Sequence, residues 1–253
     1  MKLEFKAWHL LPVTCMLIVW QLLGQFDFID TMFYPTPLTI FIRLIDLFKT
    51  SEVFVLGMLH SARRFSVAAT FAVPFSIALA IGTHLFSIVN AFVRPLIMLT
   101  YPLPKLAIYP FFLLVLGIGD GSKIFLIGTG IFYFVFLQTL HGIGKLETSN
   151  TFEMTTIYRI PFCKKVFHIM IKGALLEILE GIKQGLGHGL VMVMASELIA
   201  AQNGIGFFIW NAWDQFRIPD MYCGLLIFGI WGGAIFLVID FIKSKLRKYY
   251  GIV

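Results

Sequence analysis

The chain has 253 residues, of which 58% are apolar and only 13% are charged, and its mean hydropathy is +0.86. Soluble domains carry roughly 25% charged residues, so this composition excludes a soluble globular protein and predicts an integral membrane protein with a single domain over residues 1–253. The net charge of +6 does not indicate nucleic-acid binding, because the basic residues fall at the edges of apolar runs, where membrane topology accounts for them. Cys15, Cys163 and Cys223 are scattered and form neither a disulfide framework nor a metal-binding spacing.

Six apolar runs are predicted to cross the membrane as helices, which gives an all-α fold. Their approximate bounds are 9–25, 66–88, 94–116, 124–140, 174–200 and 223–242. The first run follows a short basic head and has the character of either a signal peptide or a span. No small-x-small cleavage pattern follows it, so we expect an uncleaved span. Residues 37–48 have apolar side chains at helical spacing and are predicted to form a helix in the membrane interface.

The second predicted span is rich in small residues, which let helix backbones approach closely in lipid. We therefore expect it to pack inside the bundle. Arg63 and Arg64 precede it and are expected to extend toward the lipid headgroups.

The third predicted span begins at Arg94 and is interrupted by Pro95, Pro102, Pro104 and Pro110. Prolines free backbone carbonyls, which membranes tolerate only against protein or a water-filled path. Lys105 lies among these prolines. As an ionisable residue at membrane depth it is either a pathway residue or a lysine close enough to the interface to reach the headgroups.

The chain between the third and fifth spans begins with a tight turn over residues 117–123, in which Asp120 is expected to cap the turn. Glu177, Glu180 and Lys183 lie three residues apart at the start of the fifth span and are expected to pair with one another.

The end of the fifth span and the segment after it carry the remaining polar signals. His188 is interpreted as a satisfied interior histidine, which is more frequent than a catalytic one. Residues 201–222 are predicted to form a loop, with Trp210 and Trp213 as anchors at the membrane interface.

Residues 147–172 form the longest polar interruption of the apolar pattern. Pro161 divides this segment, because proline is tolerated in the first turn of a helix and disfavours the helical conformation in the residue before it. We predict a short helix over about 151–158, a corner at Arg159 and Ile160, and a second helix from Pro161. Such an elbow is either a docking surface or a cytoplasmic loop with no partner.

The distribution of basic residues predicts the orientation of the chain. With the N-terminus inside, twelve Lys and Arg residues fall in inner segments and six in outer segments. The positive-inside rule therefore favours cytoplasmic N- and C-termini and a cytoplasmic elbow.

Recognisable catalytic motifs are absent from the sequence. There is no HExxH, no GxSxG and no His/Asp/Glu cluster with metal-ligand spacing. Gly144-Lys145 lacks the following Ser or Thr of a phosphate-binding loop. These observations predict that the chain is not an enzyme and does not bind ATP through that motif.

Several segments together resemble the permease subunit of bacterial ABC importers, in the branch that serves nitrate, sulfonate, taurine and related molecules. They are the elbow, the proline-broken third span, the Gly-Ile-Gly-Asp turn at 117–120, and the stretch from Ser196-Glu197 to Asn203-Gly-Ile-Gly-Phe-Phe-Ile-Trp210. The similarity covers nearly the whole chain, from Leu11-Pro12 to the basic tail.

The resemblance implies the type I ABC importer permease fold, with an elbow whose first short helix docks into a groove of an ATPase subunit. Glu153-Met154-Thr155 stands where the family has Glu-Ala-Ala, while Arg159 replaces the family's glycine and Lys172 the proline of its Leu-Pro pair. The residues that the resemblance assigns to ATPase coupling are Glu153, Met154, Thr155, Ile157, Tyr158 and Arg159.

The same resemblance implies the partners and the mechanism. Two permease subunits, usually a homodimer, form the pathway in the bacterial inner membrane; ATP and Mg are bound by the partner ATPase chains, and a periplasmic or lipid-anchored binding protein delivers the substrate. This chain itself would bind no cofactor, and Lys105 and Glu197 are its candidate pathway residues. Two other classes stay open: a channel or scaffold subunit without an ATPase, and a membrane-embedded enzyme with an unfamiliar site.

Overall fold

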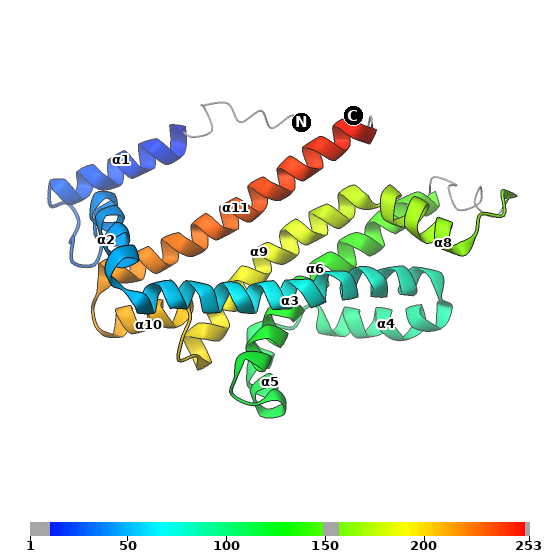
Figure 1. Ribbon diagram of the computed structural model, residues 1–253, viewed down its shortest axis with the longest axis horizontal. Coiled ribbons are helices and arrows are strands. Elements are labelled where there is room, and N and C mark those ends of the chain that lie inside the picture. The colour runs from blue at the N-terminus through cyan, green and yellow to red at the C-terminus, as the bar shows by residue number, and fades with distance from the viewer. Residues whose placement is uncertain (1–10, 149–156, 251–253) are drawn as a thin grey trace.

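The computed structural model describes residues 11–148 and 157–250, and every regular element in them is helical (Figure 1). The described residues form ten α-helices, a 3-10 segment η2 and a π-helical segment η3: α1 Leu11–Gln25, α2 Pro37–Thr50, α3 Glu52–Leu85, α4 Ser87–Thr100, η2 Lys105–Ile108, α5 Tyr109–Leu116, α6 Asp120–Thr148, α8 Phe162–Lys164, η3 Lys165–Ile171, α9 Leu175–Ala200, α10 Ile205–Asp214 and α11 Ile218–Tyr250. The all-α prediction is confirmed.

The helices that are long and apolar enough to cross a membrane number three within the described residues: α3, α6 and α11. Two bent pairs raise the number to five if each counts as one span: α4 with η2 and α5, bent by 100°, and α9 with α10, bent by 50°. α1 is apolar but has only 15 residues, about 22 Å of helix against a hydrocarbon core of about 30 Å. The first predicted span, at residues 9–25, therefore remains a prediction.

The centre of the bundle is the pair α6 and α9, with α3 packed across both (Figure 1). Gly181, Gly185 and Gly189 of α9 lie against α6, and a Cβ atom at Gly185 would be 2.9 Å from the carbonyl oxygen of Ile131. Such contacts let the two backbones approach more closely than any larger residue would allow. The buried core between the three helices includes Ala68, Ala72, Ile127, Ile131, Val135 and Val193.

The second and third predicted spans begin at the wrong residues. α3 starts at Glu52 rather than near residue 66, so Arg63 and Arg64 lie inside the helix and do not precede it. Arg64 is 2% exposed, which contradicts the prediction that it extends toward the headgroups. α4 starts at Ser87, directly after a reversal at Phe86, so Arg94 lies within the helix. These shifts remove more basic residues from the outer segments than from the inner ones, and the charge bias keeps its sign.

The predicted loop at 201–222 is wrong. Residues 205–214 form α10, and α11 begins at Ile218. Glycine and tryptophan suggested a loop, but Gly204, with a φ of +115°, forms the turn that starts α10. Trp210 and Trp213 are both half-exposed on this helix.

The local pairing predicted for Glu177, Glu180 and Lys183 is also wrong, because each residue forms its ion pair with another helix and not within α9. Glu177 accepts from Lys145 of α6 at 3.0 Å, and Lys183 lies 2.7 Å from Asp240 of α11. Glu180 forms an ion pair with Lys243 of α11. These ion pairs connect the elbow end of α9 to both neighbouring helices.

Outside the central helices, α2 is a helix as predicted and buries Ile40, Leu44 and Leu47. Arg43 of α2 binds Asp220 of α11 at 2.5 Å, and this hydrogen bond raises the pKa of Arg43 above its ordinary value. The contact fixes α2 against the start of α11, beside α10 (Figure 1).

Candidate functional site

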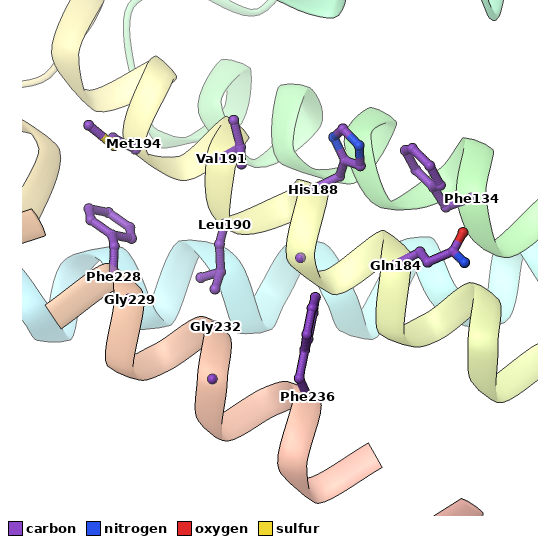
Figure 2. Close-up of a pocket in the computed structure, with 12 residues that line it drawn as sticks. Phe134, Gln184, His188, Leu190, Val191, Met194, Phe228, Gly229, Gly232 and Phe236 are labelled. Carbon is purple, nitrogen blue, oxygen red and sulfur yellow. The ribbon is translucent and has the colours of Figure 1, made fainter. Parts of the chain in front are cut away.

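Two cavities lie beside the α6–α9 pair, and they share two lining residues. The first, of about 670 Å³, lies between α9 and α11 and is called here the α9–α11 cavity (Figure 2). The second, of about 510 Å³, is lined by Lys105 and other residues around η2 and is called the Lys105 cavity. Phe134 of α6 and His188 of α9 line both cavities. Their rings stack with centroids 4.1 Å apart and planes 15° apart, and this stack forms part of the wall of both cavities.

The α9–α11 cavity is mostly apolar. A Cβ atom at Gly187 of α9 would lie 3.0 Å from the ring of Phe236 of α11. Gly232 of α11 lies close to Leu190 of α9 (Figure 2). Gln184 is its amide-bearing residue; it donates to Glu180 at 3.1 Å and accepts weakly from Gln138 at 3.4 Å. Small residues on both helices keep this space open.

Lys105 lines the second cavity from the break between α4 and α5. Its ammonium group donates to the carbonyl oxygens of Thr100 at 2.8 Å, Tyr101 at 2.7 Å and Leu103 at 3.0 Å. It also lies 3.9 Å from the centroid of the Tyr133 ring, a cation–π arrangement. Lys105 therefore caps the carboxyl end of α4 and places a positive charge at the cavity wall. Within the described residues, no carboxylate forms an ion pair with it.

Glu197 is buried at the far end of α9 from the elbow and lines neither of these cavities. Its carboxylate accepts hydrogen bonds from Arg64 at 2.6 Å, from Ser61 and from the backbone N–H of Gly206 at 2.9 Å. Arg64 supplies the opposite charge, and the other two donors occupy lone pairs of the carboxylate oxygens. The buried charge of Glu197 is therefore compensated. The carboxylate also fills the space that a Cβ atom at Gly204 would need.

Arg64 connects three elements at this end of the bundle. Its guanidinium binds Glu197 of α9, Asp120 in the first turn of α6 at 2.8 Å, and the carbonyl oxygen of Asn203 at 3.0 Å. Asp120 thus begins a helix and pairs with Arg64, where a turn cap was expected. The network fixes the α9–α10 turn against α3 and α6.

The predicted elbow is described only in part. Glu153, Met154 and Thr155 lie outside the described residues, and their role in ATPase coupling stays a prediction. Ile157 and Tyr158 expose 74% and 76% of their surface at the start of the described segment. Arg159 has a φ of +50°, in the left-handed region. The corner therefore lies at the predicted residue, with the backbone conformation for which glycine is the usual choice.

The chain after the corner leads almost directly into α9. Lys172 is helical, with φ of −68° and ψ of −40°, and the only irregular residue between η3 and α9 is Ala174. The hydrogen bond from Ala174 N–H to the Met170 carbonyl at 2.9 Å continues the helical pattern. The absence of proline at 172 is consistent with this continuity.

Two residues of the site were missed or misread from the sequence. His188 is exposed at the cavity wall, not interior. Arg64 is a buried partner of Glu197, 133 residues away in the chain. A carboxylate within an apolar run requires a partner cation, so Glu197 carried a signal, but no spacing rule identified the cation.

Comparison with known proteins places these features in context. Residues 72–248 match the model of a family described as binding-protein-dependent transport system inner membrane component. The putative aliphatic sulfonates transport permease protein SsuC of Bacillus subtilis is 25% identical over 243 residues, which cover 95% of this chain and 86% of SsuC. The taurine transport system permease protein TauC of Escherichia coli is 28% identical over 241 residues, covering 93% and 87%. The nitrate import permease protein NrtB of Synechocystis is 24% identical over 180 residues, covering 71% and 64%.

Proposed function

This chain belongs to the family of binding-protein-dependent transport system inner membrane components, and we propose that it forms the passage of an ATP-driven importer for a small anion such as a sulfonate, taurine or nitrate. Members of this family are non-catalytic membrane subunits. The three relatives named above are permeases for sulfonates, taurine and nitrate by their names, and they motivate this substrate class.

The observation that carries the proposal is the pair of cavities that meet at His188 and Phe134. These residues lie near the middle of α9 and α6, at the depth where transporters place substrate sites. Lys105 in one cavity and Gln184 in the other present polar groups on a side of the helix bundle that would otherwise face lipid. Ionisable residues at this depth face a bundle interior or a water-filled path. A second copy of the chain, as in a homodimer, would close this side into a passage.

The chain would have six spans, with α1 as the first, in the type I permease arrangement. Both termini and the elbow would be cytoplasmic, and the elbow would dock on an ATPase subunit that binds ATP and Mg. The Arg64–Glu197 end would then face the periplasm and the substrate-binding protein. Closure of the ATPase subunits would move the elbow, and the nearly continuous helix into α9 would transmit that movement to His188.

The test is reconstitution of the chain with its ATPase and binding protein in proteoliposomes, followed by uptake of radiolabelled taurine, ethanesulfonate and nitrate. We expect at least one of these anions to accumulate only when ATP is present on the ATPase side. Uptake without ATP would instead identify a channel. Failure of an ATPase to copurify with the chain would identify a scaffold subunit of another complex.

A further inference from the structure

His188 is exposed at a depth where exposure of an imidazole is unfavourable. It lies near the middle of α9, its ring stacks on Phe134, and it lines both cavities. Within the described residues, neither of its ring nitrogens has a hydrogen-bond partner. A histidine with unused donors in a membrane span is a functional candidate by default. Figure 2 shows its ring between α9 and α6, beside Phe134.

The stack fixes how the ring is presented. One face of the imidazole lies against Phe134, with the two planes only 15° apart. The ring edge, which carries both nitrogens, is left to the cavities. A neutral imidazole has one N–H donor and an imidazolium has two, so the edge can bind an oxyanion in either state.

The charges on the two sides make an anion the suitable ligand. On one side Lys105 contributes a positive charge that no carboxylate of the described residues neutralises. On the other side Glu180 pairs with Lys243, and Asp240 pairs with Lys183 at 2.7 Å. These carboxylates add no unbalanced negative charge next to Gln184. An anion that moves from Lys105 past the ring edge of His188 to Gln184 therefore meets no unpaired carboxylate of the described residues.

We propose that His188 is the specificity-determining residue of the passage. Its ring edge donates a hydrogen bond to an oxygen of the passing anion, while Phe134 holds the ring across the boundary between the two cavities. Because the rings occupy this boundary, small tetrahedral or planar oxyanions pass more readily than bulky ones. This assignment rests on the proposed import function and adds the residue that recognises the substrate.

Two substitutions at His188 separate hydrogen bonding from ring packing. His188→Phe keeps an aromatic ring on Phe134 but removes the donor, and His188→Gln keeps a donor without the ring. The control is His60→Phe, on a half-buried histidine of α3 that lines neither cavity. Each variant is reconstituted as above, and uptake is measured against the concentration of the anion that the wild type imports.

Loss of one hydrogen bond to a charged group corresponds to about a tenfold loss of affinity. We therefore expect His188→Phe to raise the half-saturating concentration about tenfold. His188→Gln should recover most of this loss, and ATP hydrolysis stimulated by the binding protein should persist in both. Unchanged uptake by His188→Phe would overturn the assignment and leave the import function standing. If the wild type imports none of the three anions, the import function fails and the assignment fails with it.

An accessibility measurement covers the case in which His188→Phe does not assemble. Cys15, Cys163 and Cys223 are first replaced by Ala, and His188→Cys is then introduced. The probe is 2-sulfonatoethyl methanethiosulfonate, a thiol reagent that is itself a sulfonate. We expect labelling at 188 that slows when the imported anion is saturating, with no such slowing for His60→Cys. Failure to label at 188, or labelling that the anion does not slow, would contradict a place for His188 in the passage.

Discussion

The guanidinium of Arg64 lies 2.6 Å from the carboxylate of Glu197, and both side chains are almost completely buried. The pair joins α3 to the end of α9, and through Ser61 and Gly206 it also fixes the start of α10. Breaking a buried pair by removing one partner leaves an uncompensated charge, which costs about 3–5 kcal/mol. This contact therefore determines whether α9, α10 and α3 hold their arrangement.

Arg64→Met should lower the free energy of unfolding by about 3–5 kcal/mol, measured by thermal unfolding of the purified chain in detergent. Arg63→Met is the matched control, because Arg63 is 65% exposed and its contact with Asp120 is longer, at 3.2 Å. An exposed pair contributes less than about 1 kcal/mol. If the two substitutions lower the free energy of unfolding equally, the Arg64–Glu197 pair stabilises the fold no more than an exposed ion pair does.

The glycines of α9 and α6 give a second test of packing. Gly185→Ala would place a Cβ atom 2.9 Å from the backbone carbonyl oxygen of Ile131, so the two helices must separate. Overpacking of this kind costs about 1–3 kcal/mol. Gly144→Ala in α6 has no atom within 4 Å of the new Cβ and should stabilise the helix by about 0.5–1 kcal/mol. Opposite signs in thermal unfolding are expected; destabilisation by both would show that Gly144 also requires its small size.

Arg159 gives a test of the elbow. A side chain in the left-handed conformation costs roughly 1–2 kcal/mol, and asparagine tolerates this conformation better than most residues. We predict that Arg159→Glu, which reverses the charge, separates ATP hydrolysis from transport while the bundle stays folded. Reversal of one charge at a desolvated interface costs several kcal/mol. Arg159→Asn removes the charge without reversing it and keeps the left-handed backbone, so it should lose less coupling than Arg159→Glu.

The readout for Arg159 is ATP hydrolysis and uptake in the same proteoliposomes. A normal transport rate with normally stimulated hydrolysis in Arg159→Glu would mean that the elbow does not dock through this residue.

The sequence was most informative where the structure depends on local pattern. Apolar runs located both ends of α9 to within one residue and those of α6 and α11 to within eight, and Pro161 correctly indicated a corner at Arg159. The sequence was least informative where a partner is remote. The charges of Glu180 and Lys183 looked locally balanced, but their partners lie on α11. α10 was missed because the same glycines that signal a loop also start a short helix.

The histidine at 188 shows the same limit at the site. Spacing along one helix could not distinguish a buried ring from one that lies at a cavity wall. That distinction depends on how closely α6 and α9 approach, and the glycines of α9 decide it. The coupling assignments of Ile157, Tyr158 and Arg159 remain predictions.

The proposed passage runs through the Lys105 cavity, beside α6 and α9, so that a small anion passes close to the Lys105 ammonium. The direct test is uptake of the imported anion by the wild type, Lys105→Met and Lys105→Arg, measured at a series of anion concentrations. If the charge attracts the anion, Lys105→Met should raise the half-saturating concentration about tenfold, as expected for loss of a nearby positive charge, while Lys105→Arg, which keeps the charge, stays close to the wild type. If Lys105→Met leaves both the rate and its concentration dependence unchanged, Lys105 only caps α4, and the passage does not run beside it.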